Sequence, residues 1–308
     1  MNSPSRPGGC RRLFLRLLLV GAALIVLLAA VAGGFWWYFH PTCEHRPGLV
    51  YGQRDGHDLT FDLACPQRPN GAGVIVIVSG RWKSRPESFD FWLTAPFLRQ
   101  GYTVFAVSHR SQPETSVQDT VADVNRAVRF IRHHAADYGI DPGRLGVTGG
   151  SSGGQLSLML VTRGGPGPAD AVDPVDRESS AVQAAAILFP VTNLVDLGTS
   201  TQNAGDGGPP KSFREAFGEE GKDPERWPAL ARELSPVYHA HAGQPPVLIL
   251  HGDGDTLVPL EQSEWFRDAS EKAGASPVKI VVREGKGHGW LRIVFDIGLF
   301  VDWFDEHL

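Results

Sequence analysis

From residue 44 onward, short apolar runs alternate with segments of mixed polarity. Six of the runs have the length and composition of buried strands, and they cover residues 74–78, 103–107, 145–148, 184–189, 247–250 and 278–282. Between the second and third run, apolar side chains recur at positions 117, 121, 124, 128 and 131, the spacing of one face of a helix. Strands that alternate with helices predict a mostly parallel central sheet with helices on both faces, which is an α/β fold.

Two further patterns complete the predicted domain, which covers residues 44–308. Residues 48–63 are typical of two strands joined around Asp55-Gly56, a hairpin signal. Residues 164–180 and 196–235 are rich in Gly, Pro, Asp and Ser. Loops of that length are uncommon unless they are functional. We therefore expect both segments to be irregular cap excursions above the sheet that shape a substrate cleft.

The N-terminal pattern differs from that of the rest of the chain, because residues 17–38 contain no charged side chain. At about 1.5 Å per residue, this stretch is long enough to cross a hydrocarbon core of about 30 Å. An aromatic cluster at residues 35–39 forms its downstream end, and the only charged side chains before it are arginines. The pattern predicts a basic cytoplasmic tail (1–16), a transmembrane signal-anchor (17–39) and an extracytoplasmic domain.

A cleaved signal peptide is the alternative interpretation of the N-terminal pattern. Ala30-Val31-Ala32 has the form of a cleavage site, so a secreted protein that begins after Ala32 is also consistent with the sequence. Both interpretations export the domain. In an oxidising compartment Cys43 and Cys65 could form a disulfide, or they could be two unpaired thiols; the sequence leaves both possibilities open.

Composition and charge exclude several classes of function. The chain has 308 residues, of which 42% are hydrophobic and 20% charged, so it is neither disordered nor collagen-like. Its net charge is −5, and residues 17–308 alone carry −9. Such an acidic body binds phosphate backbones poorly, so nucleic acid is not expected as a partner. Three cysteines without a Cys-x-x-Cys pair give no zinc site.

The residues that carry chemistry follow the predicted strands. Residues 145–154 read LGVTGGSSGG between a strand and a helix, and Gly-x-Ser-x-Gly in that position is typical of a nucleophile elbow. Two frames fit, one centred on Ser151 and the other on Ser152. An aspartate loop (Asp253 and Asp255) follows strand 247–250, and His288 follows strand 278–282. Serine, then aspartate, then histidine is the order in which α/β-hydrolases supply their triad.

Over residues 48–308 the sequence resembles a serine esterase of the α/β-hydrolase superfamily. It is similar to the branch that holds acetyl-xylan and feruloyl-type esterases and prolyl-oligopeptidase-like hydrolases. The motifs that carry the resemblance are DG-x-x-L-x-x-D at 55–62, Gly-Ile-Asp-Pro at 139–142, the elbow, Ser-Pro-Val-Tyr at 235–238, HGDGD-x-x-VP at 251–259 and GHGW at 287–290.

The resemblance implies a role for each candidate site residue. Ser151 would be the nucleophile, His288 its base and Asp255 the triad acid, while Asp253 would brace the loop. The backbone amides of Ser152 and Arg81 would form the oxyanion hole. One departure concerns Arg81, because the family commonly has a glycine-rich stretch where this chain has Ser79-Gly80-Arg81-Trp82.

These observations predict a membrane-anchored serine esterase that acts on a small-molecule or glycan ester without a metal or organic cofactor. A serine peptidase is the alternative enzyme, and Glu215, Glu219 and Glu220 would then be available for a peptide amino terminus. A catalytically silent binding module is the third possibility. The sequence does not determine the acyl length or the oligomeric state.

Overall fold

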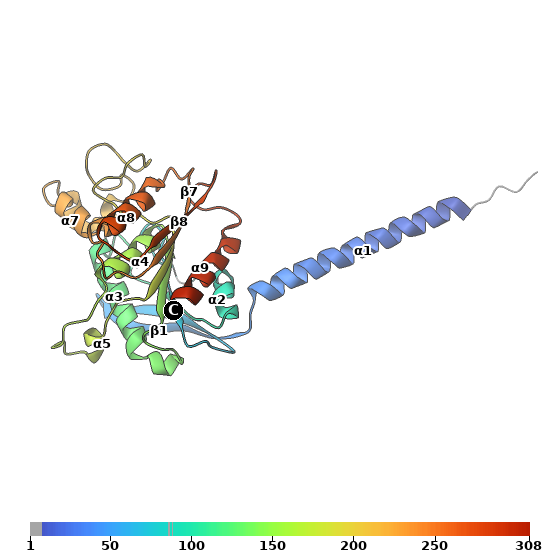
Figure 1. Ribbon diagram of the computed structural model, residues 1–308, viewed down its shortest axis with the longest axis horizontal. Coiled ribbons are helices and arrows are strands. Elements are labelled where there is room, and N and C mark those ends of the chain that lie inside the picture. The colour runs from blue at the N-terminus through green and yellow to red at the C-terminus, as the bar shows by residue number, and fades with distance from the viewer. Residues whose placement is uncertain (1–7, 86, 88) are drawn as a thin grey trace, which may run out of the picture. The chain divides into compact units, whose positions relative to one another are not determined.

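The computed structural model describes residues 8–85, 87 and 89–308, with side chains from residue 13 onward. The chain forms two compact units, Met1–Pro41 and Thr42–Leu308. In the first unit α1 (Gly8–Phe39) contains a span, Leu13–Phe39, with a mean hydropathy of 2.7 (Figure 1). By length and composition this helix could cross a membrane or act as a signal sequence. The predicted tail lies partly outside the described residues, and its last residues continue the helix.

The second unit is built on one twisted sheet, for which the described residues supply eight strands. The strands are β1 (Cys43–Arg54), β2 (His57–Pro66), β3 (Gly73–Ile77), β4 (Thr103–Val107), β5 (Leu145–Gly150), β6 (Ala184–Leu188), β7 (Val247–Gly252) and β8 (Val278–Arg283). Their order across the sheet is β1-β2-β4-β3-β5-β6-β7-β8. β2 runs antiparallel to both of its neighbours, β1 and β4, whereas β3 to β8 run parallel to one another. The predicted strands are therefore confirmed, including the hairpin at Asp55-Gly56.

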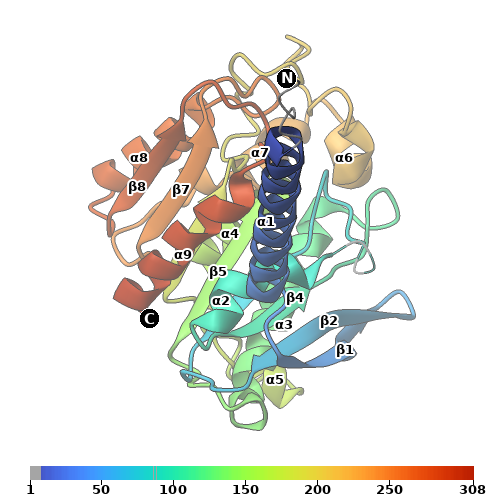
Figure 2. The same ribbon diagram turned by 90° about the vertical axis from the view of Figure 1, so that its right-hand side faces the viewer.

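Helices cover both faces of this sheet. Figure 2 looks onto the face that carries α2 (Ala95–Arg99) and α9 (Ile293–His307). The opposite face carries α3 (Val117–His133), α4 (Ser152–Arg163) and α8 (Glu261–Lys272). The shorter helical elements are η2 (Phe91–Thr94), η3 (Ala135–Tyr138), α5 (Pro174–Arg177), η4 (Arg214–Phe217), α6 (Gly218–Lys222), α7 (Trp227–Glu233) and η5 (Pro236–Tyr238). This three-layer arrangement is the predicted α/β-hydrolase fold.

Each face of the sheet has its own hydrophobic core. On the α3–α4–α8 face, the predicted stripe packs with Val124, Val128 and Ile131 fully buried against sheet residues such as Phe105. On the other face, Phe97 of α2 and Phe300 and Phe304 of α9 fill the second core. Because both faces are covered, the central strands are apolar on both sides, which explains why they appear in the sequence as unbroken apolar runs.

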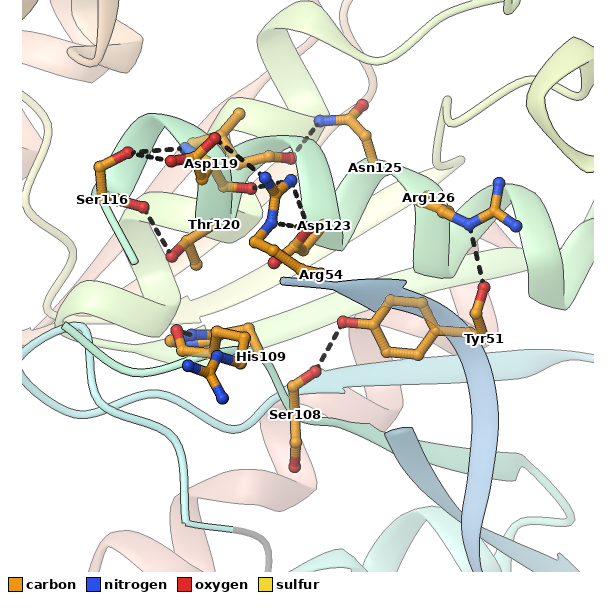
Figure 3. A network of polar contacts seen from close by, with 12 residues as sticks. Tyr51, Arg54, Ser108, His109, Ser116, Asp119, Thr120, Asp123, Asn125 and Arg126 are labelled. Atoms are coloured by element: carbon orange, nitrogen blue, oxygen red, sulfur yellow. Dashed lines mark hydrogen bonds and ion pairs between the residues drawn. The ribbon is translucent and has the colours of Figure 1, made fainter. Parts of the chain in front are cut away.

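Ion pairs connect the β1–β2 hairpin to α3. The Arg54 guanidinium, at the end of β1, donates hydrogen bonds to the carboxylates of Asp119 and Asp123 (Figure 3). Ser116 caps the N-terminus of α3 by accepting the N–H of Asp119. Burial, opposed by the Arg54 contacts, raises the pKa of Asp123. Arg54 therefore pairs with a carboxylate that would be costly to bury alone.

The two Gly/Pro-rich segments lie at different ends of the domain. Residues 196–235 lie at the carboxyl end of the strands, and several of them line hollows there. Residues 164–180 follow the far end of α4, and α5 packs at the opposite edge (Figure 1). There Asp173 and Asp176 both pair with Arg126 of α3. The expectation that 164–180 shapes the cleft was wrong, because α4 leads the chain away from the elbow.

Cys43 and Cys65 are free thiols on neighbouring strands. The register pairs Cys43 with Pro66 and Cys65 with Glu44, so the two cysteines are offset by one residue. Side chains alternate between faces along a strand, and Cys65 packs into the core beneath α3 while Cys43 packs into the other. This arrangement holds the two thiols on opposite faces of the sheet, and no disulfide joins them.

Candidate active site

Ser151 occupies a tight turn between β5 and α4. Its φ is 56° and its ψ is −118°, a conformation that non-glycine residues rarely adopt. A side chain at Gly149 would approach the carbonyl oxygen of Gly153 to 2.5 Å, so the turn needs the glycine at that position. The strained turn presents the Ser151 hydroxyl at the carboxyl edge of the sheet, as expected for a nucleophile elbow.

Ser151, His288 and Asp255 form a hydrogen-bonded chain. His288 Nε2 lies 2.9 Å from Ser151 Oγ, and His288 Nδ1 lies 2.7 Å from Asp255 Oδ2. The three residues follow β5, β8 and β7 respectively, at the edge where open parallel sheets position their sites. The hydroxyl of Ser152 takes a different direction, because it accepts the N–H of Trp82 at 3.0 Å and contacts Ser79 Oγ. The structure thus brings Ser151, not Ser152, to the histidine.

Asp255 is buried yet held in its ionised form. Burial opposes ionisation, but hydrogen bonds from His251 and His288, together with the Val258 N–H, outweigh it and hold the pKa of the carboxyl well below its usual range. The Leu257 and Val258 amides donate to Oδ1, which leaves Oδ2 for His288. An acceptor on Nδ1 leaves the Nε2 lone pair directed at Ser151, the tautomer that a general base requires.

The other acidic residue of this loop has a separate task. Asp253 Oδ1 accepts the N–H of Gly285 at 2.6 Å, which connects the β7 loop to the turn that leads to His288. The two aspartates therefore have different contacts: Asp255 bonds the His288 imidazole, and Asp253 bonds the backbone of the turn before it.

Arg81 and Trp82 form the tip of a two-residue turn opposite the elbow. Gly80 and Lys83 exchange two backbone hydrogen bonds of 2.9 Å, and the residues between them have φ values of 58° and 54°. A two-residue turn with positive φ at both positions normally favours Asn or Gly. Here Trp82 stabilises it: its N–H bonds Ser152, its indole N–H bonds Gln155 Oε1, and its ring packs on Phe217.

Two backbone amides at the site are not engaged. Among the described residues, no hydrogen-bond acceptor contacts the N–H of Ser152 or of Arg81. Ser152 is the first residue of α4, where N–H groups have no partner within the helix. Unpaired amides beside a serine hydroxyl are the groups that an oxyanion hole supplies.

The sequence analysis assigned no role to two residues, His251 and Phe189, that support this chain of contacts. His251 is fully buried behind Asp255. Its Nε2–H is shared between the Val258 carbonyl at 2.8 Å and Asp255 Oδ2 at 3.5 Å, and its Nδ1 accepts from Ser263. The ring of Phe189, a residue with φ of 34°, lies 4.5 Å from the His288 ring. His251 was visible as part of the HGDGD motif, whereas no sequence signal distinguished Phe189 from an ordinary core residue.

Two hollows lie at the carboxyl edge of the sheet near the elbow, and Ser151 borders the smaller one. The small hollow, of about 40 Å³, is mostly apolar and is bounded by Ser151, Ser152, Val191, Leu197, Phe213 and Val258, among others. The large cleft, of about 790 Å³, extends between the turn at residues 79–83 and α9, and its walls include Gly149, Gly150, Phe97 and Ile297. Arg81 and Phe213 border both. Substrate groups thus have two places near the elbow, one in contact with Ser151 and one beyond Gly149 and Gly150.

The carboxylates considered for a peptide amino terminus are engaged elsewhere. Glu215 and Glu219 both pair with Lys222, and Glu220 lies 3.5 Å from Arg226. None of the three borders the small hollow or the large cleft. They form a solvated surface patch on η4 and α6, which does not favour the peptidase alternative.

Several curated proteins that are similar in sequence to this chain are esterases. Esterase LipQ of Mycobacterium tuberculosis is 30% identical over 209 residues, which are 67% of this chain and 47% of that protein. A probable isoprenylcysteine alpha-carbonyl methylesterase of Arabidopsis thaliana is 26% identical over 249 residues, which are 79% of this chain and 50% of that protein. The chain thus spans about half the length of these curated relatives.

Solved structures share the fold over most of their length. A truncated carbohydrate esterase from gut microbiota aligns with a TM-score of 0.70 and 25% identity, covering 85% of this chain and 95% of that one. Esterase 2 of Thermogutta terrifontis, phosphoramylated by tabun, aligns with a TM-score of 0.66 and 27% identity, covering 86% of this chain and 93% of that one. The resemblance to α/β-hydrolase serine esterases is confirmed at this level, whereas the narrower branch stays a prediction.

The family of this chain is shown by a match to a family model, and the matched residues include the elbow and the Asp255 loop. The BD-FAE family model aligns with residues 61–269, more than half of the chain. The chain therefore belongs to the BD-FAE family.

Proposed function

We propose that this protein hydrolyses carboxylic esters through an acyl-enzyme formed on Ser151. The observation that carries the proposal is the hydrogen-bonded chain from Ser151 Oγ through His288 to Asp255, with distances of 2.9 and 2.7 Å. Its esterase relatives and its membership of the BD-FAE family support the same reaction class.

In the first step, His288 Nε2 takes the Ser151 proton while Oγ attacks the acyl carbon. The carbonyl oxygen becomes an oxyanion, which receives hydrogen bonds from the Ser152 and Arg81 amides. Asp255 stabilises the imidazolium and holds its orientation. The imidazolium then gives its proton to the departing alkoxide, which leaves as the alcohol.

In the second step, water replaces the alcohol. His288 takes a proton from the water, the hydroxide attacks the acyl carbon, and the second oxyanion occupies the same two amides. When the C–Oγ bond breaks, Ser151 recovers its proton from His288 and the carboxylic acid departs. His288 accepts and returns each proton in this cycle, so no further acid or base is required.

Labelling with a fluorophosphonate tests the proposal. We expect an adduct on Ser151 in the unmodified protein and no adduct in Ser151→Ala. Ser152→Ala is the matched control: it loses the contact to the Trp82 N–H and turns over more slowly, but it keeps its backbone amide and its label on Ser151. Mass spectrometry that assigns the adduct to Ser152, or no reaction with either the probe or p-nitrophenyl acetate, would contradict the proposal.

The proposed location of the protein is based on α1 and on the arginines that precede residue 17. We infer that the helix is an uncleaved anchor and that residues 44–308 form an extracytoplasmic catalytic domain. The uncharged length of residues 17–38 supports the anchor, and the upstream arginines support the orientation.

A further inference from the structure

The two hollows beside Ser151 can be assigned to the two halves of an ester. This assignment rests on the proposed function. In the acyl-enzyme the acyl carbon is bonded to Ser151 Oγ, so the acyl group must lie in a hollow that Ser151 itself borders. Ser151 borders the small hollow and does not border the large cleft. The small hollow thus receives a short acyl group, and the large cleft receives the alcohol half.

The large cleft carries positive charge in an acidic domain. Arg81, Lys83 and Arg85 border it, and no Asp or Glu is among its described lining residues. All three side chains are exposed. Within the described part of the chain, the side chains of Arg81 and Lys83 have no hydrogen-bond or ion-pair partner. Residues 17–308 carry a net charge of −9, so this group of cations opposes the average charge of the domain.

The inner part of the same cleft is apolar. Its walls include Val76, Leu93, Phe97 and Ile297, which come from β3, η2, α2 and α9. The volume of about 790 Å³ lies within the range of small-molecule sites, roughly 300 to 1,000 Å³. An occupant that suits both parts has an apolar body and a negatively charged group.

We propose that the preferred substrates are short-chain acyl esters of an alcohol that carries an anionic group, a carboxylate or a phosphate, on an apolar body. The alcohol half occupies the large cleft, and Arg81 and Lys83 contact the anion at its mouth. The turn at residues 80–83 serves both oxyanion stabilisation and binding of the anion. It holds the backbone amide of Arg81 at the oxyanion site, and it presents the Arg81 and Lys83 side chains to the large cleft.

The test compares 4-acetoxybenzoate with its neutral near-isostere 4-acetoxybenzamide, using the full-length protein in detergent. The readout is the ratio of their kcat/KM values, each divided by the rate of spontaneous hydrolysis. Exposed ion pairs are weak, so we expect about a two- to fivefold preference for each cation that contacts the carboxylate. The preference should decline as salt is added.

Substitution of Lys83 makes the test specific. Lys83→Gln should bring the ratio closer to one, and Arg81→Gln combined with it should remove the preference. Lys272→Gln, an exposed lysine at the end of α8, is the matched control and should leave the ratio unchanged.

The possible outcomes separate this inference from the proposed function. If neither acetate ester is hydrolysed, the proposed function is wrong. If both are hydrolysed but the ratio is one or less, or Lys83→Gln leaves it unchanged, the anionic alcohol is wrong while the esterase stands. If phenyl hydrogen glutarate is preferred over its terminal amide, with the charge now in the acyl half, the assignment of the two hollows is wrong.

Discussion

Unusual backbone conformations gather at the site. Among the described residues, the non-glycine residues with positive φ are Asp55, Arg81, Trp82, Ser151 and Phe189, and four of these five lie around the Ser151 hydroxyl. Each such residue costs on the order of 1–3 kcal/mol and persists only where its surroundings impose it. Here the surroundings are the Trp82 contacts, the glycine at 149 and the packing of Phe189 on His288. The site is therefore organised before a substrate arrives.

Asp255→Asn should reduce kcat by about 10⁴-fold while the protein stays folded. An asparagine amide donates to the imidazole, so the wrong tautomer faces Ser151; the magnitude is that of the same exchange in a serine protease. The comparison is made by steady-state kinetics on p-nitrophenyl acetate, with circular dichroism to verify folding.

Asp253→Asn is the matched control for that prediction. Its side-chain carbonyl can still accept the Gly285 N–H, so the turn before His288 keeps its support. We expect a loss of less than about tenfold, because only a charge-assisted bond becomes a neutral one. Equal losses in two folded variants would contradict the assignment of Asp255 as the triad acid.

Elements with a strong period were predictable, and elements held by tertiary contacts were not. The central strands are buried on both faces, so they appear in the sequence as unbroken apolar runs. Helix α3 is buried on one face, so its apolar residues recur every three or four positions. Arg81-Trp82 carries no turn signal, because its conformation depends on Ser152 and Gln155, about 70 residues away. The same limit applies within the site. The order of Ser151, Asp255 and His288 was readable, and the family resemblance favoured the Ser151 frame that spacing alone left open, while the position of residues 164–180 depended on three-dimensional contacts.

The segment between β4 and α3 contains a buried histidine that should make the fold sensitive to acid. Burial, only partly opposed by a hydrogen bond to the Arg110 carbonyl, lowers the pKa of His109 to about 4. Its Nε2 is buried without a hydrogen-bond partner among the described residues. Figure 3 shows this side chain beside Ser108, below the Arg54 contacts.

Between about pH 6.5 and pH 4 the unfolded chain binds a proton at His109 that the folded chain does not. The free energy of unfolding therefore falls as the pH falls through this window, by up to about 3 kcal/mol from this residue. Urea unfolding at pH 7 and pH 4.5 measures the loss. In His109→Asn the side-chain amide can still donate to the Arg110 carbonyl, but it does not titrate. The decrease in the free energy of unfolding between pH 7 and pH 4.5 should therefore be smaller in this variant, by most of the ~3 kcal/mol assigned to His109. An identical pH dependence in the two proteins would show that His109 contributes nothing to it.

At the scale of the whole molecule, the two units match two environments. The first unit offers lipid a helix whose apolar stretch is not buried inside the protein, while the second has a hydrophobic core on each face of its sheet and an acidic net charge that suits water. The proposed substrates, with a short acyl group and an anionic alcohol, would be soluble, so the proposed anchor would not be needed to extract a lipid substrate. We infer that it instead confines an enzyme for soluble esters to the outer side of a membrane.

The confinement has a direct test in fractionation of cells that produce the full-length chain. Twenty-two uncharged residues provide far more apolar area than salt-sensitive surface contacts, so the esterase activity should stay with the membranes after a high-salt wash and be released by detergent. Protease added to intact cells or spheroplasts should degrade the catalytic domain, because the arginines that precede the uncharged stretch of residues 17–38 favour the cytoplasmic side. A soluble product that begins at Gly33 would replace the anchor with a cleaved signal and leave export intact, whereas full-length active protein in the cytosol would contradict both.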